Sequence, residues 1–135
     1  MDPLKIDTVR LSEAGDALVI IDQTLLPNEV RYLRLRETED ICEAIRMLRV
    51  RGAPAIGVAA AFGAYLAARF APDERLEESF LAACDALAAS RPTAVNLFWA
   101  LDRMRRAYAA VRGGEPGEIR RALRREAQAI MDEDI

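Results

Sequence analysis

The sequence predicts an α+β fold, with a small antiparallel sheet of about three strands at the N-terminus followed by a bundle of about five helices. Two changes along the chain support this prediction. Up to residue 36, apolar residues occur in short runs or alternate with polar ones, as in strands. From Thr38 onward they recur every three or four residues, as in amphipathic helices. The length of 135 residues is that of one domain.

Three segments are expected to form the sheet. Residues 8–12 are a short first strand, and the turn sequence EAGD separates them from the continuous apolar run ALVIID at residues 17–22. After LPN, the segment VRYLRLR at residues 30–36 alternates leucine with arginine, which is the period of a strand with one wet face. We therefore expect its arginines to face solvent.

Two helices should follow the sheet. The first is expected to begin with Thr38 as its cap and to end near Arg49. The second is expected to begin at Pro54, because proline is favoured at the first helical position. Residues 52–68 carry no charge and are rich in alanine and glycine, so this helix is expected to be packed on all sides rather than to span a membrane.

Three more helices should complete the bundle. The sequence APDE precedes the third helix, and RPT precedes the fourth, which Gly113 and Gly114 end. The fifth helix begins near Pro116 and is expected to run to the last residue. Their apolar faces are Leu76, Phe80, Ala83 and Leu87; Leu97, Leu101, Met104, Tyr108 and Val111; and Ile119, Leu123, Ala127 and Ile130. The final residues, MDEDI, place acidic side chains at a helix C-terminus, which the helix dipole disfavours. We therefore expect the chain to be part of a longer protein.

The charge balance and the histidine and cysteine content argue against several classes of function. The chain carries 19 basic and 22 acidic residues, and its net charge of −3 argues against nucleic acid or a membrane surface as a partner. It contains no histidine, which argues against a self-contained metal site or a Ser-His triad. Cys42 and Cys84 lie in helical apolar patterns without metal or redox spacing. Buried free thiols in a cytoplasmic protein are the expected interpretation.

Two arginines stand just before expected helix starts. In the sequence RGAP, Arg51 precedes Gly52 and Ala53, where free backbone amides and the helix dipole favour an anion. Arg91 stands likewise before the fourth helix, which Thr93 can cap. A guanidinium suits phosphate or carboxylate, so both arginines can converge on one anionic ligand. The alternative for each is a pair with a nearby carboxylate of the chain.

Other residues are weaker candidates. Asn96 can contact a ligand, although a hydrogen bond at the helix start is favoured, and residues 22–24 can line a site or simply form a turn at a strand end. Trp99 is expected in the core. The cluster of Arg103, Arg105 and Arg106 is expected to be a helix surface.

Three motifs carry a resemblance to a known family. They are DQTLLP at residues 22–27, VRGAPAIGVAAAFG at residues 50–63, and SRPTAVNLFWALDRM at residues 90–104. In order and spacing they resemble the N-terminal domain of the methylthioribose-1-phosphate isomerases. Those enzymes belong to a wider family with ribose-1,5-bisphosphate isomerase and the regulatory subunits of translation initiation factor 2B. The likeness runs over nearly the whole chain and favours the methylthioribose branch.

The resemblance implies an intramolecular oxidoreductase, an aldose-ketose isomerase that converts 5-methylthioribose 1-phosphate into 5-methylthioribulose 1-phosphate in methionine salvage. It implies no metal or organic cofactor, and a homodimer for the full-length protein. By the same resemblance, Arg51, Gly52, Ala53 and Arg91 contact the phosphorylated sugar. The alternatives are a ribose-1,5-bisphosphate isomerase and a regulatory or scaffolding subunit like those of initiation factor 2B.

The family's catalytic cysteine and aspartate lie in a second, Rossmann-like domain, C-terminal to the region that this chain resembles. Residues 1–135 are therefore expected to be an N-terminal domain that is inactive alone, with the catalytic domain absent. Cys42 and Cys84 do not match the motif of the catalytic cysteine, so the resemblance assigns a catalytic role to neither.

Overall fold

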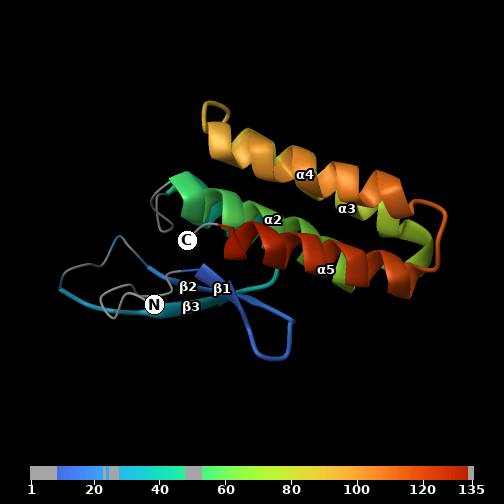
Figure 1. The fold of residues 1–135 in the computed structure, drawn as a ribbon. Coiled ribbons are helices and arrows are strands. Elements are labelled where there is room, and N and C mark those ends of the chain that lie inside the picture. Colours follow the sequence, from blue (N-terminus) through green and yellow to red (C-terminus); the bar gives the residue numbers. More distant parts are fainter. Residues whose placement is uncertain (1–8, 23, 25–27, 48–52, 134–135) are drawn as a thin grey trace.

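The computed structural model describes residues 9–22, 24, 28–47 and 53–133. It confirms the α+β class, with a three-stranded antiparallel sheet followed by the helices (Figure 1). The strands are β1 (Val9–Leu11), β2 (Leu18–Ile21) and β3 (Tyr32–Leu35), in the order β1-β2-β3. In the register of the sheet, Ile20 lies opposite Val9 on one side and Leu33 on the other. All four residues of β2 are buried, whereas β3 alternates exposed Tyr32 and Arg34 with partly buried Leu33 and Leu35, as its sequence predicts.

The helical part contains five α-helices and a short 3-10 helix within the described residues. They are α1 (Thr38–Arg46), α2 (Ala53–Phe70), η2 (Asp73–Arg75), α3 (Leu76–Ser90), α4 (Val95–Val111) and α5 (Pro116–Asp132). The apolar faces expected for α3, α4 and α5 are buried, apart from Val111, which is partly buried. Helix α1 ends three residues before the expected Arg49, with Met47 as its C-cap.

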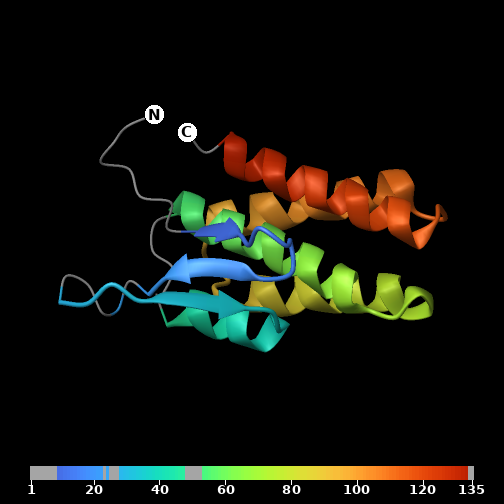
Figure 2. The same ribbon diagram turned by 90° about the horizontal axis from the view of Figure 1, so that it is seen from below.

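Helix α2 is the centre of the molecule. It packs against α1, α3, α4, α5 and the sheet, and Figures 1 and 2 show it enclosed between these layers. Five of its alanines are completely buried: Ala59, Ala60, Ala61, Ala64 and Ala68. None of the described helices is long and apolar enough to cross a membrane. The uncharged run therefore reflects burial on all sides, as expected.

Two glycines of α2 allow neighbouring helices to approach closely. A Cβ atom at Gly63 would lie 3.2 Å from Ile41 Cγ2 of α1 and 3.3 Å from Leu87 Cδ1 of α3. A Cβ atom at Gly57 would lie 3.0 Å from the backbone oxygen of Asn96 in α4. The small residues noted in the sequence thus set the separation between α2 and three different helices.

Two capping predictions are wrong. Thr38 is the first residue of α1 rather than its cap, and the N-cap, Glu37, makes no side-chain cap hydrogen bond. The acidic first turn of α1 provides the favourable charge there instead. Thr93 does not cap α4, because a turn closed by the Ala94 N–H donating to the Arg91 oxygen (3.0 Å) makes Ala94 the N-cap.

The core assignment of Trp99 is also wrong, since 51% of this residue is exposed. The buried stripe of α4 passes through Leu97 and Leu101, which are both fully buried. Trp99 lies two residues from each of them, which is about 200° around a helix. Its indole therefore points away from the stripe, and about half of it is left uncovered by the described residues.

Candidate functional site

The starts of α2 and α4 lie side by side at one end of the molecule. The two helices run in the same direction, and their first residues are at the end where β2 finishes (Figures 1 and 2). Gly57, the fifth residue of α2, contacts the first turn of α4, since the Asn96 carbonyl would stand 3.0 Å from a Cβ at Gly57. The unpaired amides and the positive dipole ends of two helices therefore lie close together.

The charges in the first helical turns distinguish α2 and α4 from the other α-helices. The first turns of α1, α3 and α5 contain Glu39 and Asp40, Glu77 and Glu78, and Glu118, respectively. The first turns of α2 and α4 contain no acidic residue. The positive ends of α2 and α4 are thus not neutralised by a carboxylate in their first turns, which favours an external anion. The sequence already contains this signal once the helix starts are known.

Arg91 occupies the turn between α3 and α4 and is partly buried. Its backbone oxygen accepts the Ala94 N–H at 3.0 Å, which ties the residue to the start of α4. Within the described part of the chain, its guanidinium makes no hydrogen bond or ion pair. For Arg91, the alternative of a carboxylate partner is therefore not found among these residues, and the guanidinium is available to a ligand.

The other three expected contact residues are placed only in part. Arg51 and Gly52 lie outside the described residues. Ala53 is the first residue of α2, so its backbone stands at the helix start. The convergence of Arg51 and Arg91 on one anion thus stays a prediction, for which the adjacent starts of α2 and α4 supply the scaffold.

Asp22 follows β2 at the same end of the molecule and is buried, with 3% exposure. Its Oδ1 accepts the Thr24 N–H at 3.0 Å and the Thr24 hydroxyl at 2.6 Å, and its N–H donates to the Arg31 oxygen at 2.8 Å. These contacts are those of a turn at a strand end, one of the two interpretations that the sequence left open. Gln23 lies outside the described residues.

Both cysteines are buried and free, as expected. Burial raises the pKa of the Cys84 thiol to about 12, and burial also raises the pKa of Cys42. Both thiols are therefore protonated at neutral pH, and a protonated, buried thiol is a poor nucleophile. The arrangement at the starts of α2 and α4 is suited to holding an anion, while these two thiols serve the core.

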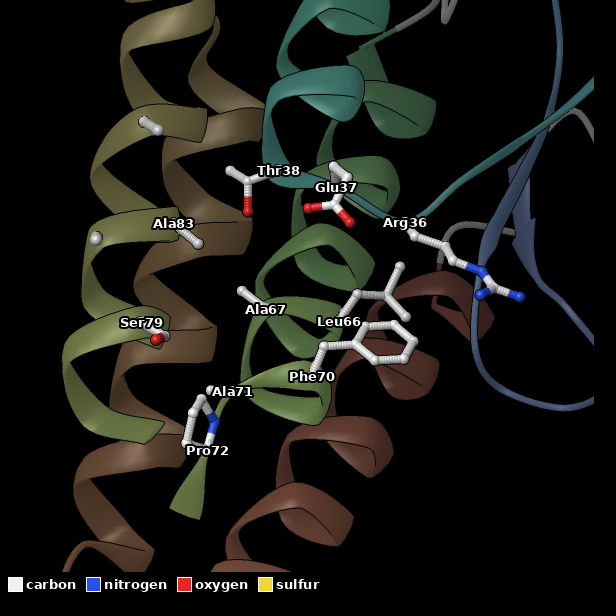
Figure 3. A pocket seen from close by; sticks show the side chains of 12 residues that line it. Arg36, Glu37, Thr38, Leu66, Ala67, Phe70, Ala71, Pro72, Ser79 and Ala83 are labelled. Carbon is white, nitrogen blue, oxygen red and sulfur yellow. The ribbon is translucent and has the colours of Figure 1, made fainter. Parts of the chain in front are cut away.

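A separate groove of about 470 Å³ lies between the start of α1, the end of α2 and α3. Alanine side chains line much of it, and Phe70 stands at its edge (Figure 3). Figure 3 also shows that the Arg36 side chain points away from the groove. Without a cation directed into it, this groove is a weaker anion site than the starts of α2 and α4.

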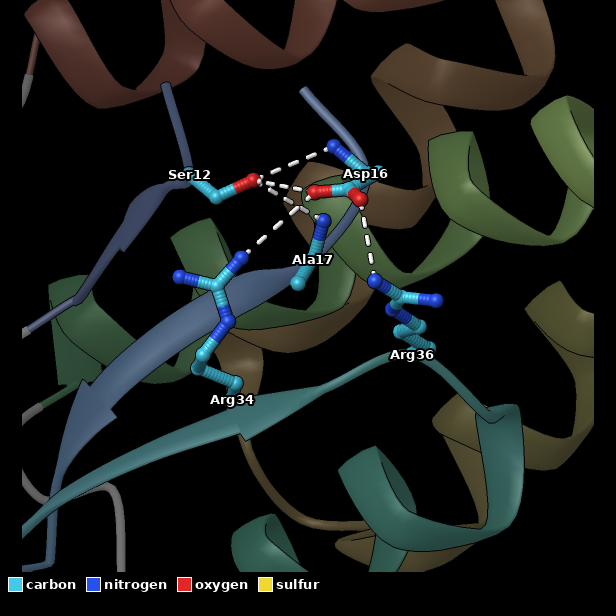
Figure 4. A network of polar contacts seen from close by, with 5 residues as sticks. All are labelled: Ser12, Asp16, Ala17, Arg34 and Arg36. Carbon is cyan, nitrogen blue, oxygen red and sulfur yellow. Dashed lines mark hydrogen bonds and ion pairs between the residues drawn. The ribbon is translucent and has the colours of Figure 1, made fainter. Parts of the chain in front are cut away.

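Arg36 instead joins a polar network that ties β3 to the turn after β1 (Figure 4). Ser12 Oγ donates to Asp16 Oδ1 at 2.8 Å, and Asp16 Oδ2 pairs with Arg36 at 3.0 Å. Arg34 lies 3.6 Å from Asp16 Oδ1. The hydrogen bond from Ser12, and then the charges of Arg36 and Arg34, lower the pKa of Asp16. Arg34 and Arg36 remain more than half exposed, so the expected solvated face is confirmed.

The arginine cluster of α4 is only partly a solvated surface. Arg106 is 79% exposed and pairs with Asp102 within the helix. Arg103 is only 20% exposed, because it pairs with Glu126 at 2.8 Å and Glu133 at 3.0 Å. It therefore joins α4 to the end of α5, which the local sequence pattern did not indicate.

Comparison with known proteins identifies the family. Residues 49–135, which include both arginine motifs, match the Initiation factor 2 subunit family. The chain belongs to this family. Members of the Initiation factor 2 subunit family thus share the region that contains α2, α3, α4 and α5.

The chain is also similar in sequence to two isomerases of sugar 1-phosphates. It is 54% identical over 135 residues to methylthioribose-1-phosphate isomerase of Symbiobacterium thermophilum, covering 98% of this chain and 38% of that protein. It is 50% identical over 129 residues to 5-deoxyribose 1-phosphate isomerase of Petrotoga mobilis, covering 93% of this chain and 37% of that protein. The chain therefore spans less than two fifths of the length of either relative.

A solved structure agrees with the fold. The crystal structure of 5-methylthioribose 1-phosphate isomerase from Pyrococcus horikoshii OT3 superposes with a TM-score of 0.87 at 39% identity. The match covers 93% of this chain and 36% of that one. The described sheet and helices are thus an arrangement already known in a longer isomerase.

Proposed function

We propose that the chain is the N-terminal, substrate-binding domain of a methylthioribose-1-phosphate isomerase. The full-length enzyme converts 5-methylthioribose 1-phosphate into 5-methylthioribulose 1-phosphate in methionine salvage, without a metal or organic cofactor. The observation that supports this most is the pair of helix starts, α2 and α4, which touch at Gly57 and Asn96, contain no first-turn carboxylate and adjoin Arg91. The similarity to isomerases whose named substrates are pentose 1-phosphates agrees with it.

In this proposal the phosphate group lies against the amides at the two helix starts. The guanidinium of Arg91, and that of Arg51 in the segment before α2, bind its oxygens. The buried α2 gives the site a rigid wall, because its alanines and glycines are packed against four other helices and the sheet. Rigid placement of the phosphate orients the sugar for chemistry performed elsewhere in the full-length protein.

The substrate dictates what the rest of the enzyme supplies. A phosphate on the anomeric oxygen prevents the sugar from simply opening to a free aldehyde, so the enzyme must stabilise an unusual intermediate away from water. The proposed catalytic cysteine and aspartate belong to a second, Rossmann-like domain that follows residue 135. Residues 1–135 then bind substrate but do not turn it over. We further propose that the full-length protein is a homodimer. We also propose that it is cytoplasmic, because its two unpaired thiols stay reduced in that compartment.

The choice of substrate is open to a direct test. The two relatives are named for pentoses that both carry a 1-phosphate, the group that the α2 and α4 starts are suited to bind. Full-length protein is assayed with 5-methylthioribose 1-phosphate, 5-deoxyribose 1-phosphate and ribose 1,5-bisphosphate. We expect the highest kcat/KM for the first and no turnover by residues 1–135 alone. A preference for the bisphosphate, or turnover by the 135-residue chain, contradicts the proposal.

The anion site is tested by substrate binding to the full-length protein. Arg51→Ala and Arg91→Ala should each weaken binding by about 2 to 5 kcal/mol, as expected when a charged partner in a closed site is removed. Arg106→Ala is the matched control, because Arg106 is an exposed arginine of α4 paired only within the helix. If Arg51→Ala binds normally and no sugar phosphate is turned over, the chain is better explained as a regulatory subunit of the kind named by its family.

A further inference from the structure

The first two turns of α4 present three large apolar side chains to solvent. Val95 is 77% exposed, Phe98 44% and Trp99 51%. Their spacing of three and four residues places them on one side of the helix. Farther along α4, Asp102 and Arg106 form an exposed ion pair. The three exposed apolar side chains thus form a cluster at the start of α4. Clusters of this kind mark interaction surfaces, whereas single exposed apolar residues do not.

Exposed apolar side chains gather at this end of the molecule. Met47 follows the last residue of α1 and is 54% exposed. Val30, two residues before β3, is 61% exposed, and Tyr32, the first residue of β3, is 57% exposed. Figure 2 shows that α1 ends and β3 begins at the end where α2 and α4 start. In the described residues, only Phe70 and Leu81 are exposed large hydrophobics on other parts of the fold.

The last described residues lie next to the cluster on α4. The Arg103 guanidinium carbon stands 5.0 Å from the centre of the Trp99 ring. The same guanidinium pairs with Glu126 of α5 and with Glu133, which caps the end of α5. Trp99 and Glu133, the last described residue, therefore contact the same guanidinium, that of Arg103.

We propose that Val95, Phe98 and Trp99, together called the α4 apolar surface, bind the part of the full-length protein that follows residue 135. This inference rests on the proposed function, in which such a part exists. More than three fifths of the length of the isomerase relatives lies outside their match to this chain. Polypeptide leaving α5 needs only a short connection to reach the α4 apolar surface, so closure costs little loop entropy.

The docked part would also stand over the starts of α2 and α4. The α4 apolar surface begins at Val95, the first residue of α4, four positions after Arg91. Covering it brings an apolar wall next to the anion site and excludes water from it, which strengthens the binding of a charged group. Docking and substrate closure would thus occur at one interface.

Trp99 is the single tryptophan of the 135 residues, which makes it a direct probe. Full-length protein is labelled with 5-fluorotryptophan, and the Trp99 resonance is assigned by its loss in Trp99→Phe. The ¹⁹F shift between H₂O and D₂O then reports solvent access. The reference is Phe70→Trp in the Trp99→Phe background, because Phe70 and Trp99 are each 51% exposed in the described fold.

We expect a solvent isotope shift for Trp99 that is several-fold smaller than that of the Phe70→Trp reference. An equally large shift for Trp99 overturns the proposal. Protection of Trp99 that disappears on dilution, together with dissociation seen by light scattering, also overturns it and assigns the surface to a second copy. The readout requires no turnover, so the absence of isomerase activity would count against the proposed function alone.

A second measurement uses limited proteolysis of full-length protein. Phe98→Gln should accelerate cleavage of the polypeptide just after residue 133 several-fold, because the docked part is released more often. Leu81→Gln is the matched control, since Leu81 is an exposed apolar residue on α3. Equal cleavage rates for the two variants contradict the proposal.

Discussion

The backbone oxygen of Asn96 lies 3.0 Å from the position that a Cβ atom would occupy at Gly57. This approach brings the second turn of α2 and the first turn of α4 together, and so places the two helix N-termini near each other. The candidate anion site therefore depends on a residue that touches no ligand itself. A side chain at Gly57 would have to separate the helices, because a backbone carbonyl cannot rotate away as a flexible side chain can.

Gly57→Val is expected to destabilise the chain by about 1 to 3 kcal/mol, the usual cost of overpacking. Gly117→Val is the matched control, since a Cβ there meets only the end of the Arg121 side chain, at 3.4 Å. Valine has a somewhat higher helix propensity than glycine, so a loss of stability in Gly57→Val relative to Gly117→Val, measured by urea unfolding, reports the contact between α2 and α4. Equal free energies of unfolding would show that this contact is not tight.

Arg120 is expected to stabilise the far end of α2. Its Nε donates to the Ala68 oxygen at 3.0 Å, and its Nη2 donates to the Ala71 oxygen at 2.8 Å. Because charged donors satisfy otherwise free carbonyls of a helix end, Arg120→Ala should lower the free energy of unfolding by about 1.5 to 3 kcal/mol. The exposed neighbour Arg121 supplies the control, and Arg121→Ala should change the thermal midpoint little.

The network around Asp16 predicts an acid-dependent contribution to stability. The pKa of Asp16 is lowered in the fold, first by the hydrogen bond from Ser12 and then by Arg36 and Arg34. A carboxyl whose pKa is lower in the folded state stabilises the fold above its ordinary value of 3.8 and loses that contribution as the pH falls below it. Asp16→Asn should therefore flatten the acid side of the stability profile.

The contributions to this pKa can be separated by NMR titration of the Asp16 carboxyl. Ser12→Ala should raise the pKa of Asp16 more than Arg36→Gln does, and Arg36→Gln more than Arg34→Gln. Arg31→Gln is the control, since Arg31 pairs with Glu29 instead. A pKa that is the same in all these variants would contradict the network drawn in Figure 4.

Cys84 is expected to react with thiol reagents only when the chain unfolds. Its pKa of about 12 reflects burial, so the thiolate is absent at neutral pH and the sulfur is inaccessible. Since the folded pKa exceeds the ordinary value of 9.0, this thiol stabilises the fold below pH 9 and loses that contribution as the pH rises above it. Labelling of Cys42→Ala protein with a thiol reagent should therefore follow urea unfolding, and fast labelling of the native state would contradict this burial.

The expectations that held are those set by short-range periodicity. The alternation in residues 30–36 matches the alternating exposure of the β3 side chains. The spacing of Leu97, Leu101, Met104 and Tyr108 matches the buried stripe of α4. The two thiols are also buried as expected. Backbone geometry converts such spacing directly into faces, so these features need no knowledge of partners.

The expectations that failed concern what lies beyond each element. Trp99 is aromatic but half exposed, because it lies on the side of α4 opposite the buried stripe of Leu97 and Leu101. Thr93 has the chemistry of a cap, yet the turn from Arg91 to Ala94 moves the helix start past it. The pairing of Arg103 with Glu126 and Glu133 joins residues of two helices and has no local signal.

By itself, the sequence determined the strand and helix order, the buried faces and the resemblance from which Arg51 and Arg91 are expected to contact a phosphorylated sugar, because these follow from local patterns. Tertiary structure alone decided that α2 and α4 start side by side through Gly57 and Asn96, and that Val95, Phe98 and Trp99 stay uncovered. Those facts depend on how helices distant in the chain pack together, which no local periodicity specifies.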